Sequence, residues 1–167
     1  VVISSGSIER PLVFGNNDTP GVMLSSAAKE YLKVYGVLVG KKPLIFTNND
    51  SGYETAIEFK KNGIDSIILD TRKDPNSEII NEAKNLKIDI KFSYVVVAAK
   101  GYKKVKSADI AKISEDKKQL SQTENINCDC ICVSGFWTPT IHLASQSGNK
   151  TKFNEDIDTF VPGQSKQ

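Results

Sequence analysis

The stretch LIFTNNDSGYETA, residues 44–56, decides the fold class of this 167-residue chain. The apolar run PLIF at 43–46 is too short for a helix and is followed by turn formers, after which apolar residues recur at helical spacing from Tyr53 to about Asn62. A buried strand, a tight turn and a helix in this order form the phosphate-binding unit of dinucleotide-binding domains. The stretch therefore predicts a Rossmann-like strand–turn–helix.

The turn has lost most of its glycines. In a working turn the first glycine permits the bend, the second lets the backbone approach the pyrophosphate, and the third lets helix and strand pack closely. In this sequence the three glycine positions are occupied by Thr47, Asn49 and Gly52. Because asparagine tolerates left-handed backbone angles, the bend itself can persist without the first two glycines. Asp50 can cap the helix but would repel a phosphate. The sequence leaves two interpretations open, a degenerate nucleotide site and a turn that serves only as a turn. The candidate binding residues here are Thr47, Asn48, Asn49, Asp50, Ser51 and Gly52.

Asp70 and Arg72 extend this candidate site. Asp70 follows Thr47 by 23 positions, close to the interval at which an acidic residue binds an adenosine ribose. An arginine nearby suits a 2′-phosphate, so the pair is ambiguous between NAD and NADP. The alternative is that Asp-x-Arg after a strand is a solvated turn.

The rest of the chain predicts one α/β unit with an inserted meander. Strands alternate with helices of about ten residues between 23 and 92, with Gly36 ending the first helix, which argues for a parallel sheet with right-handed crossovers. From residue 93, strand-like segments joined at Lys100–Gly101 predict an antiparallel meander. We expect a polar connector at 116–127, a returning apolar strand at 128–135 and turns and loops thereafter.

Composition sets limits on function. The net charge of +2 comes from 22 basic and 20 acidic residues spread along the chain, so we expect no nucleic-acid partner. No apolar run approaches the roughly 20 residues that span a membrane. The three cysteines do not suggest a secreted disulfide framework, and we expect a cytoplasmic location.

Other candidate sites are weak. Cys128, Cys130 and Cys132 alternate, so a strand would turn all three to one face, where they would be small buried hydrophobes and not metal ligands. His142 has no obvious partner and is assigned to a loop, and the lysine-rich stretch 100–106 to a solvated hairpin. We predict no catalytic and no metal-binding residue. The opening VVISSGS is strand-like and lacks an initiator methionine, so we expect a piece of a longer protein.

Four stretches carry a family resemblance. They are SGSIERPLVFGNNDTPGVMLSSA, LIFTNNDSGYETA, VSGFWTPTIHLASQSG and FVPGQS, and in this order they span nearly the whole chain. The chain closely resembles the central part of the alpha subunit of heterotetrameric sarcosine oxidase. ERPLVF with NND, and W-x-P-T-x-HL, are specific combinations.

More distantly, VVISSGS followed by TNNDSGYETA looks like the layout of thioredoxin-reductase-like flavoproteins. There an ATG-type strand closes the first dinucleotide domain and a GGGDSA-type turn opens the second. On this pattern Ser4, Ser5 and Gly6 take the first motif, with Arg10 at the rim of a nucleotide site. The resemblance implies a Rossmann-like three-layer α/β domain over 1–167, with a central parallel sheet and an antiparallel β-meander, as in FAD/NAD(P)-binding domains. Within it, 1–22 is a crossing segment, 23–92 βα units, 93–135 meander and return strand, and 136–167 a tail.

The resemblance also implies a parent activity. The parent enzyme would oxidatively demethylate sarcosine to glycine, yield formaldehyde or methylene-tetrahydrofolate, and produce hydrogen peroxide. The complex would hold FAD and FMN, and its alpha subunit would bind NAD, chiefly outside this segment. The partners would be beta, gamma and delta subunits, and the ligands sarcosine and tetrahydrofolate. Two alternatives stay open: a non-catalytic scaffold that presents surfaces to other subunits, or an alpha-type subunit of a related amino-acid, opine or cyanide-forming oxidase.

Overall fold

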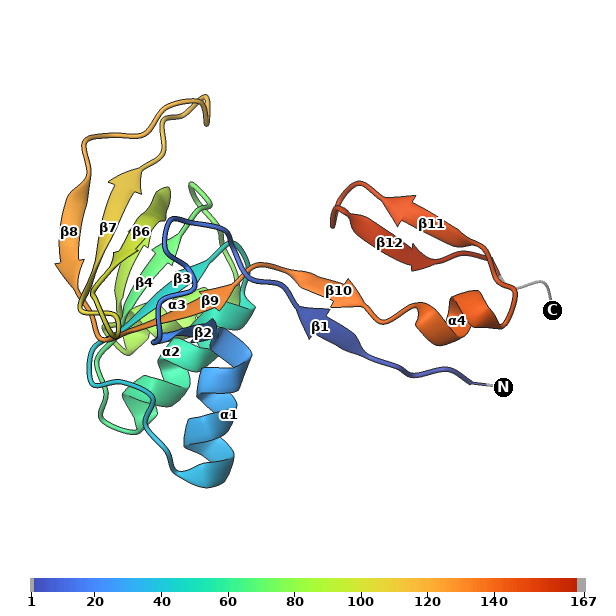
Figure 1. The fold of residues 1–167 in the computed structure, drawn as a ribbon, viewed down its shortest axis with the longest axis horizontal. Coiled ribbons are helices and arrows are strands. Elements are labelled where there is room, and N and C mark those ends of the chain that lie inside the picture. The colour runs from blue at the N-terminus through green and yellow to red at the C-terminus, as the bar shows by residue number, and fades with distance from the viewer. Residues whose placement is uncertain (1, 165–167) are drawn as a thin grey trace. The chain divides into compact units, whose positions relative to one another are not determined.

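The computed structural model of the chain describes residues 2–164 (Figure 1). Its contacts form two compact units, one of Pro11–Gly135 and the other of the residues up to Arg10 together with those from Phe136 onward. A single domain over residues 1–167 stays a prediction.

The larger unit is built on a five-stranded parallel sheet. Its strand order is β2-β9-β3-β4-β5. The strands are β2 (Val22–Leu24), β3 (Pro43–Thr47), β4 (Ile67–Asp70), β5 (Asp89–Phe92) and β9 (Cys130–Ser134). All five residues of β3 and all five of β9 are buried, as expected for central strands covered on both faces.

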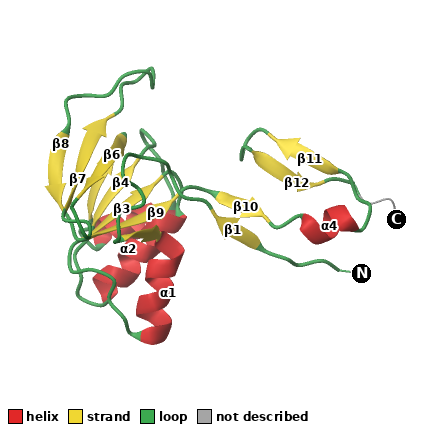
Figure 2. Ribbon diagram, in the orientation of Figure 1, coloured by secondary structure: helices red, strands yellow, loops and turns green. Residues whose placement is uncertain are grey.

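Three helices cover one face of this sheet (Figure 2). They are α1 (Ser25–Tyr35), α2 (Ser51–Lys61) and α3 (Glu78–Asn85). Gly36 ends α1 in the left-handed conformation with φ 64°, and its N–H donates to the Leu32 carbonyl oxygen at 3.0 Å, so the predicted helix stop is confirmed. Ile45 and Ile68 point into this helix-side core.

An antiparallel meander covers the other face. It consists of β6 (Tyr94–Lys100), β7 (Ser107–Lys112) and β8 (Glu124–Asn127) in the order β6-β7-β8. Leu44 and Phe46, which alternate with Ile45 along β3, pack in the core on this side. The result is a three-layer unit of helices, parallel sheet and meander, with one core on each face of the sheet.

Two predictions about this unit are wrong. Residues 124–127 of the expected polar connector form β8, whose backbone pairs with β7. The three cysteines are all buried, as predicted, but do not share a face: Cys128 lies in the meander-side core, whereas Cys130 and Cys132 lie in the helix-side core with their Sγ atoms 3.7 Å apart. The reason is a bend at Asp129, whose carboxylate accepts the backbone N–H groups of Lys41 and Lys42, each at 2.8 Å.

The smaller unit contains more regular structure than the sequence predicts. Its elements are β1 (Ser7–Glu9), β10 (Trp137–Pro139), α4 (His142–Gln146), β11 (Thr151–Asn154) and β12 (Thr159–Pro162). The strands form two antiparallel pairs, β1 with β10 and β11 with β12, and the Phe153 and Phe160 rings meet edge-on at 5.2 Å between centroids. The assignment of this tail to turns and loops is therefore wrong. So is the expected opening strand, because residues 2–6 are not in a strand; Val1 lies outside the described residues.

No helix in residues 2–164 combines the length and apolar character needed to cross a membrane.

Candidate functional site

The candidate site lies at the carboxyl edge, the edge of the parallel sheet at which β9, β3 and β4 end. Thr47 pairs in register with Ser134 on one side and with Asp70 on the other. The N–H of Thr71 donates to the Thr47 carbonyl oxygen at 3.0 Å, which holds the two strand ends together. The fold thus brings the 47–52 turn, Asp70 and Arg72 to one place, where open α/β sheets bind ligands.

The turn is closed by its own side chains. The Thr47 hydroxyl oxygen accepts the Asn49 N–H at 3.1 Å and donates to the Asn49 carbonyl oxygen at 2.8 Å. The Asn49 side-chain oxygen accepts the Ser51 N–H at 2.8 Å, and its amide nitrogen donates to the Ser134 carbonyl oxygen at 3.2 Å and to the Asn48 side-chain oxygen at 3.0 Å. Two backbone N–H groups of the turn, those of Asn49 and Ser51, therefore already have acceptors within it.

Gly52 keeps the close packing expected of the third glycine. A Cβ atom built on Gly52 would lie 2.7 Å from the Thr47 Cβ and 2.8 Å from its hydroxyl oxygen, far inside van der Waals contact. Only a glycine lets α2 approach the end of β3 this closely.

Asp70 is completely buried and fully engaged by neighbouring donors. Its side chain has 0% exposure. Its carboxylate accepts the Tyr53 hydroxyl at 2.7 Å, the Arg72 backbone N–H at 2.9 Å, and the Arg72 Nε and Nη2 at 3.0 Å and 2.8 Å. Burial, and then the hydrogen bond to Asp70, raise the pKa of Tyr53 above its ordinary value.

Arg72 bridges two carboxylates. Its Nη1 lies 2.8 Å from the Asp50 Oδ1, while Nη2 contacts Asp70. Burial lowers the pKa of Arg72, but the hydrogen bonds to Asp70 and Asp50 raise it, and the net shift is upward. Asp50 stands at the N-cap position of α2 without a side-chain capping hydrogen bond, so the possible cap is replaced by the ion pair to Arg72. The interpretation of Asp-x-Arg as a simple solvated turn is wrong for Asp70.

The other predicted residues lie in the smaller unit. The Ser5 hydroxyl donates to the Thr140 carbonyl oxygen, and the Thr140 N–H donates to the Gly6 carbonyl oxygen at 2.9 Å. Ser4 is exposed. The Arg10 guanidinium donates to the carbonyl oxygens of Ile157 at 3.0 Å and Asp158 at 3.1 Å, so its donors serve the β11–β12 turn.

Sequence reasoning missed two members of the carboxyl edge. The sequence places Tyr53 on the apolar face of α2, but its hydroxyl also donates a hydrogen bond to Asp70. A tyrosine at a fully buried helical position could have predicted this contact, because a buried hydroxyl needs a hydrogen-bond partner. The carbonyl oxygen of Ser134 accepts hydrogen bonds from the Asn48 backbone N–H and the Asn49 side-chain amide. No pattern of side chains in the sequence predicts a contact to a backbone carbonyl.

The remaining candidates lie away from the carboxyl edge. His142 is exposed and begins the short helix α4, so its assignment to a loop is wrong. Among residues 2–164, no three His, Cys, Asp or Glu side chains are grouped so as to hold a metal ion.

The fold is shared with flavoprotein oxidoreductases. Thioredoxin reductase from T. acidophilum matches with a TM-score of 0.66 and 16% identity over 88% of this chain and 47% of that one. L-proline dehydrogenase from P. horikoshii matches with a TM-score of 0.59 and 21% identity over 97% of this chain and 26% of that one. The predicted Rossmann-like fold of thioredoxin-reductase-like FAD/NAD(P)-binding domains is thereby confirmed.

The sequence matches one kind of relative along nearly its whole length. Sarcosine oxidase subunit alpha of Rhizobium meliloti (strain 1021) is 35% identical over 164 residues, which are 97% of this chain and 15% of the relative. The subunit from Corynebacterium sp. (strain P-1) is 32% identical over 164 residues, again 97% of this chain and 17% of the relative. No protein-family profile matches the chain. The predicted resemblance is confirmed: the chain is similar from end to end to one segment, about a sixth in length, of sarcosine oxidase alpha subunits.

Proposed function

We propose that this chain is a dinucleotide-binding-like scaffold within an oxidoreductase subunit of the sarcosine oxidase type, and that its β3–α2 turn holds no dinucleotide. The observation that carries the proposal is the state of Asp70. A ribose-binding carboxylate must present free acceptor positions to two hydroxyls, whereas Asp70 has 0% exposure and accepts from Tyr53 and Arg72. A ribose would have to displace both donors.

The phosphate seat supports the same conclusion. A pyrophosphate at a helix N-terminus needs free N–H groups and a positive local field. In this turn the N–H groups of Asn49 and Ser51 donate to side chains of the turn itself, and Asp50 places a carboxylate at the start of α2. The residues at this edge therefore do not fit a dinucleotide, and the turn contributes shape to the domain.

The activity of the whole protein follows the relatives and is part of the proposal. The chain would belong to an enzyme that oxidatively demethylates sarcosine to glycine and produces hydrogen peroxide, with formaldehyde or methylene-tetrahydrofolate as the other product. The proposal also includes FAD and FMN in the complex and NAD elsewhere in the alpha subunit. The partners would be beta, gamma and delta subunits. The support is the end-to-end similarity to alpha subunits from two genera.

The first test is an amide NMR titration of the 167-residue chain with NAD and NADP separately. We expect no saturable shift at residues 47–53 or at Asp70 up to millimolar nucleotide. Saturation at micromolar concentration would overturn the scaffold assignment. The ambiguity between NAD and NADP at Arg72 is resolved by the same experiment if either ligand binds.

A variant sharpens the titration. Thr47→Gly/Asn49→Gly restores two glycines but leaves Asp50, Asp70 and Arg72 in place, so we expect at most weak binding, with a Kd of about 1 mM or higher. Micromolar binding by this variant would mean that the missing glycines alone had disabled the turn.

The activity is tested on the complete protein with its partner subunits. We expect hydrogen peroxide and glycine from sarcosine, and no comparable peroxide formation with L-proline. Preference for L-proline would assign the chain to another amino-acid oxidase while leaving the scaffold role of the turn intact.

A further inference from the structure

A hollow lies at the opposite edge of the parallel sheet, where the strands begin. It has a volume of about 480 Å³ and is bounded by the starts of β3, β4 and β5 and by the β8–β9 connection. We call it the amino-edge hollow. Its apolar lining comes from Pro43, Leu44, Ile67, Ile88, Ile126 and Cys128, and its polar lining from Lys42, Lys60, Asp65, Ser66, Lys87, Asp89 and Asn127.

The wall of the hollow is apolar and neutral. Leu44 and Cys128 are buried in the meander-side core, and Ile67 and Ile126 pack against the same core. Burial raises the pKa of the Cys128 thiol to about 12, so this side chain stays protonated at neutral pH. An uncharged body of a ligand could lie against this wall without desolvating a charge.

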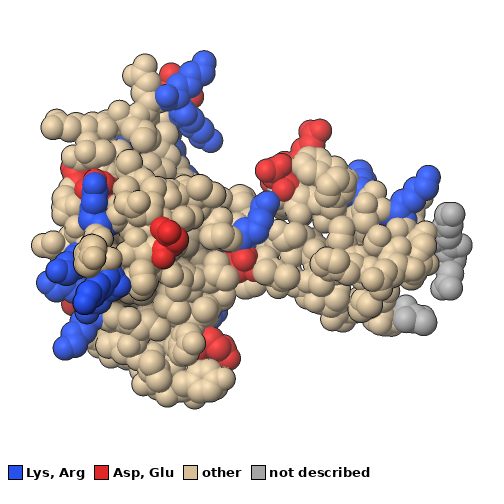
Figure 3. Space-filling view, in the orientation of Figure 1, with Lys and Arg blue, Asp and Glu red and all other residues tan. Residues whose placement is uncertain are grey.

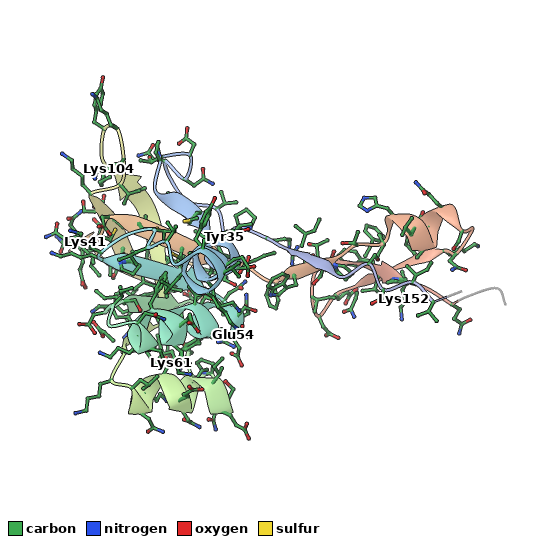
Figure 4. The ribbon with its side chains drawn as sticks, turned by 90° about the horizontal axis from the view of Figure 1, so that it is seen from below. Tyr35, Lys41, Glu54, Lys61, Lys104 and Lys152 are labelled. Atoms are coloured by element: carbon green, nitrogen blue, oxygen red, sulfur yellow. The ribbon has the colours of Figure 1, made fainter. Side chains whose placement is uncertain are left out.

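The rim is basic. Lys60 is held by Asp65, with Nζ 2.6 Å from the carboxylate oxygen. Lys42 and Lys87 are exposed, and neither forms an ion pair with any residue from 2 to 164. Figure 3 shows basic side chains gathered at the end of the larger unit where β3 begins, and Lys41, labelled in Figure 4, lies at this same end. Asp89 is the one acidic side chain of the lining that has no cationic partner in the described chain, so the rim is cationic on balance.

Ser66 supplies an unused polar group. The residue is 6% exposed and lines the hollow, and its hydroxyl oxygen has no hydrogen-bond partner among the described residues. Most buried hydroxyls in folded proteins have a hydrogen-bond partner, so this group is unusual.

We propose that the amino-edge hollow binds a small organic anion, in which an apolar body lies against the Leu44–Ile67–Ile126 wall and one acidic group faces Lys42 and Lys87. An apolar wall with a few polar groups around it is the usual composition of a small-molecule site. The site is independent of the carboxyl edge, because no residue of the 47–52 turn, Asp70 or Arg72 lines it.

The test uses a matched pair of probes on the 167-residue chain. The first, 8-anilinonaphthalene-1-sulfonate, has an apolar two-part body and one anionic group; the second, N-phenyl-1-naphthylamine, has the same body and no charge. We expect the sulfonate to bind at least about threefold more tightly than the neutral probe, since each ammonium group contributes a modest, partly screened attraction. Amide shifts should appear at Ser66, Asp89 and Cys128.

Substitutions then locate the anionic group. Lys42→Gln/Lys87→Gln should weaken sulfonate binding about tenfold and leave the neutral probe unaffected. Lys41→Gln removes the same charge next to Lys42 but outside the lining, and should change neither probe. Circular dichroism confirms that each variant is folded.

Three results would overturn the proposal. They are equal binding of the two probes, sulfonate binding that is insensitive to the double lysine substitution, and amide shifts confined to Tyr31–Tyr35, where exposed aromatic residues line a separate hollow. None of these outcomes bears on the scaffold role of the 47–52 turn.

Discussion

Polar side chains are paired to different degrees at the two edges of the parallel sheet. At the carboxyl edge, Asp50, Arg72, Asp70 and Tyr53 form one connected set of ion pairs and hydrogen bonds. At the amino edge, Lys60 pairs with Asp65, but Lys42, Lys87 and Ser66 have no ion pair or side-chain hydrogen bond to described residues. A Rossmann-like sheet usually binds its ligand at the first edge. Here the chain itself fills that place, and the polar groups left available lie at the other end.

The largest expected effect comes from removing the cation that serves both carboxylates. Arg72→Met should lower the free energy of unfolding by roughly 3 kcal/mol, because Asp70 then stays buried without its charge partner. The matched control is Lys61→Met, which breaks an exposed pair with Glu82 and should cost at most about 0.5 kcal/mol. Urea denaturation measures both. Equal losses of unfolding free energy in the two variants would mean that the Arg72 ion pairs stabilise the protein no more than an exposed surface pair does.

The next effect tests the contact between α2 and β3. Gly52→Ala should lower the free energy of unfolding by about 2 kcal/mol, since its methyl group would lie 2.7 Å from the Thr47 Cβ. Gly36→Ala is a useful comparison, because it meets open space and carries only the left-handed backbone cost of about 1 kcal/mol.

The double variant Thr47→Gly/Gly52→Ala separates steric overlap from general loss of packing. Its destabilisation should be smaller than the sum of the two single effects. Strict additivity in urea denaturation would show that the two side chains do not compete for the same space.

A smaller effect reports on the hydroxyl that holds Asp70. Tyr53→Phe should lower the free energy of unfolding by about 1.5 kcal/mol at pH 7, because the carboxylate loses one donor and keeps Arg72. Tyr102→Phe, at the exposed tip of the β6–β7 hairpin, should have no effect.

The pH dependence of the same variant adds a second readout. The pKa of Tyr53 is raised in the folded state, so the unfolded state ionises first and the stabilisation is lost as pH rises above about 10. Tyr53→Phe should therefore flatten the fall in stability above pH 10. An unchanged slope in denaturant titrations would contradict the buried, neutral state of this hydroxyl.

The smallest effect is expected at the amino edge. Ser66→Ala removes a hydroxyl without a described partner, so the free energy of unfolding should stay within about 0.5 kcal/mol of the parent or rise. A loss above about 1 kcal/mol by thermal or urea denaturation would show that this edge, too, is internally satisfied.

The sequence was sufficient for the strand–turn–helix because three independent signals coincide there. The apolar run at 43–46 is short, the turn residues are polar, and Gly52 lies where the helix must approach the strand; the structure has β3, the turn and α2 in that order. The candidate residues of the turn, Asp70 and Arg72 also follow from the carboxyl ends of neighbouring parallel strands.

What the sequence could not supply depends on partners far along the chain. The sequence of β8, ENIN, has little apolar alternation and therefore predicts a polar connector. The strand forms because its backbone pairs with β7 and because the Asn125 side chain donates a hydrogen bond to Asp109 at 2.9 Å. The Cys128 face was misjudged because the bend at Asp129 is fixed by the backbone of Lys41 and Lys42, 87 residues and more away. The engagement of Asp70 by Tyr53 likewise depends on how α2 lies over β4.

The Arg72 bridge also makes the order of substitutions at this edge matter over evolutionary time. Replacing Arg72 first leaves the buried Asp70 carboxylate without a charge partner, whereas replacing Asp50 first leaves Arg72 paired one-to-one with Asp70. Glycines added to the turn by themselves meet the same two carboxylates. A series of substitutions toward nucleotide binding would therefore pass through a less stable protein if it began at Arg72, and would avoid that loss if it began at Asp50.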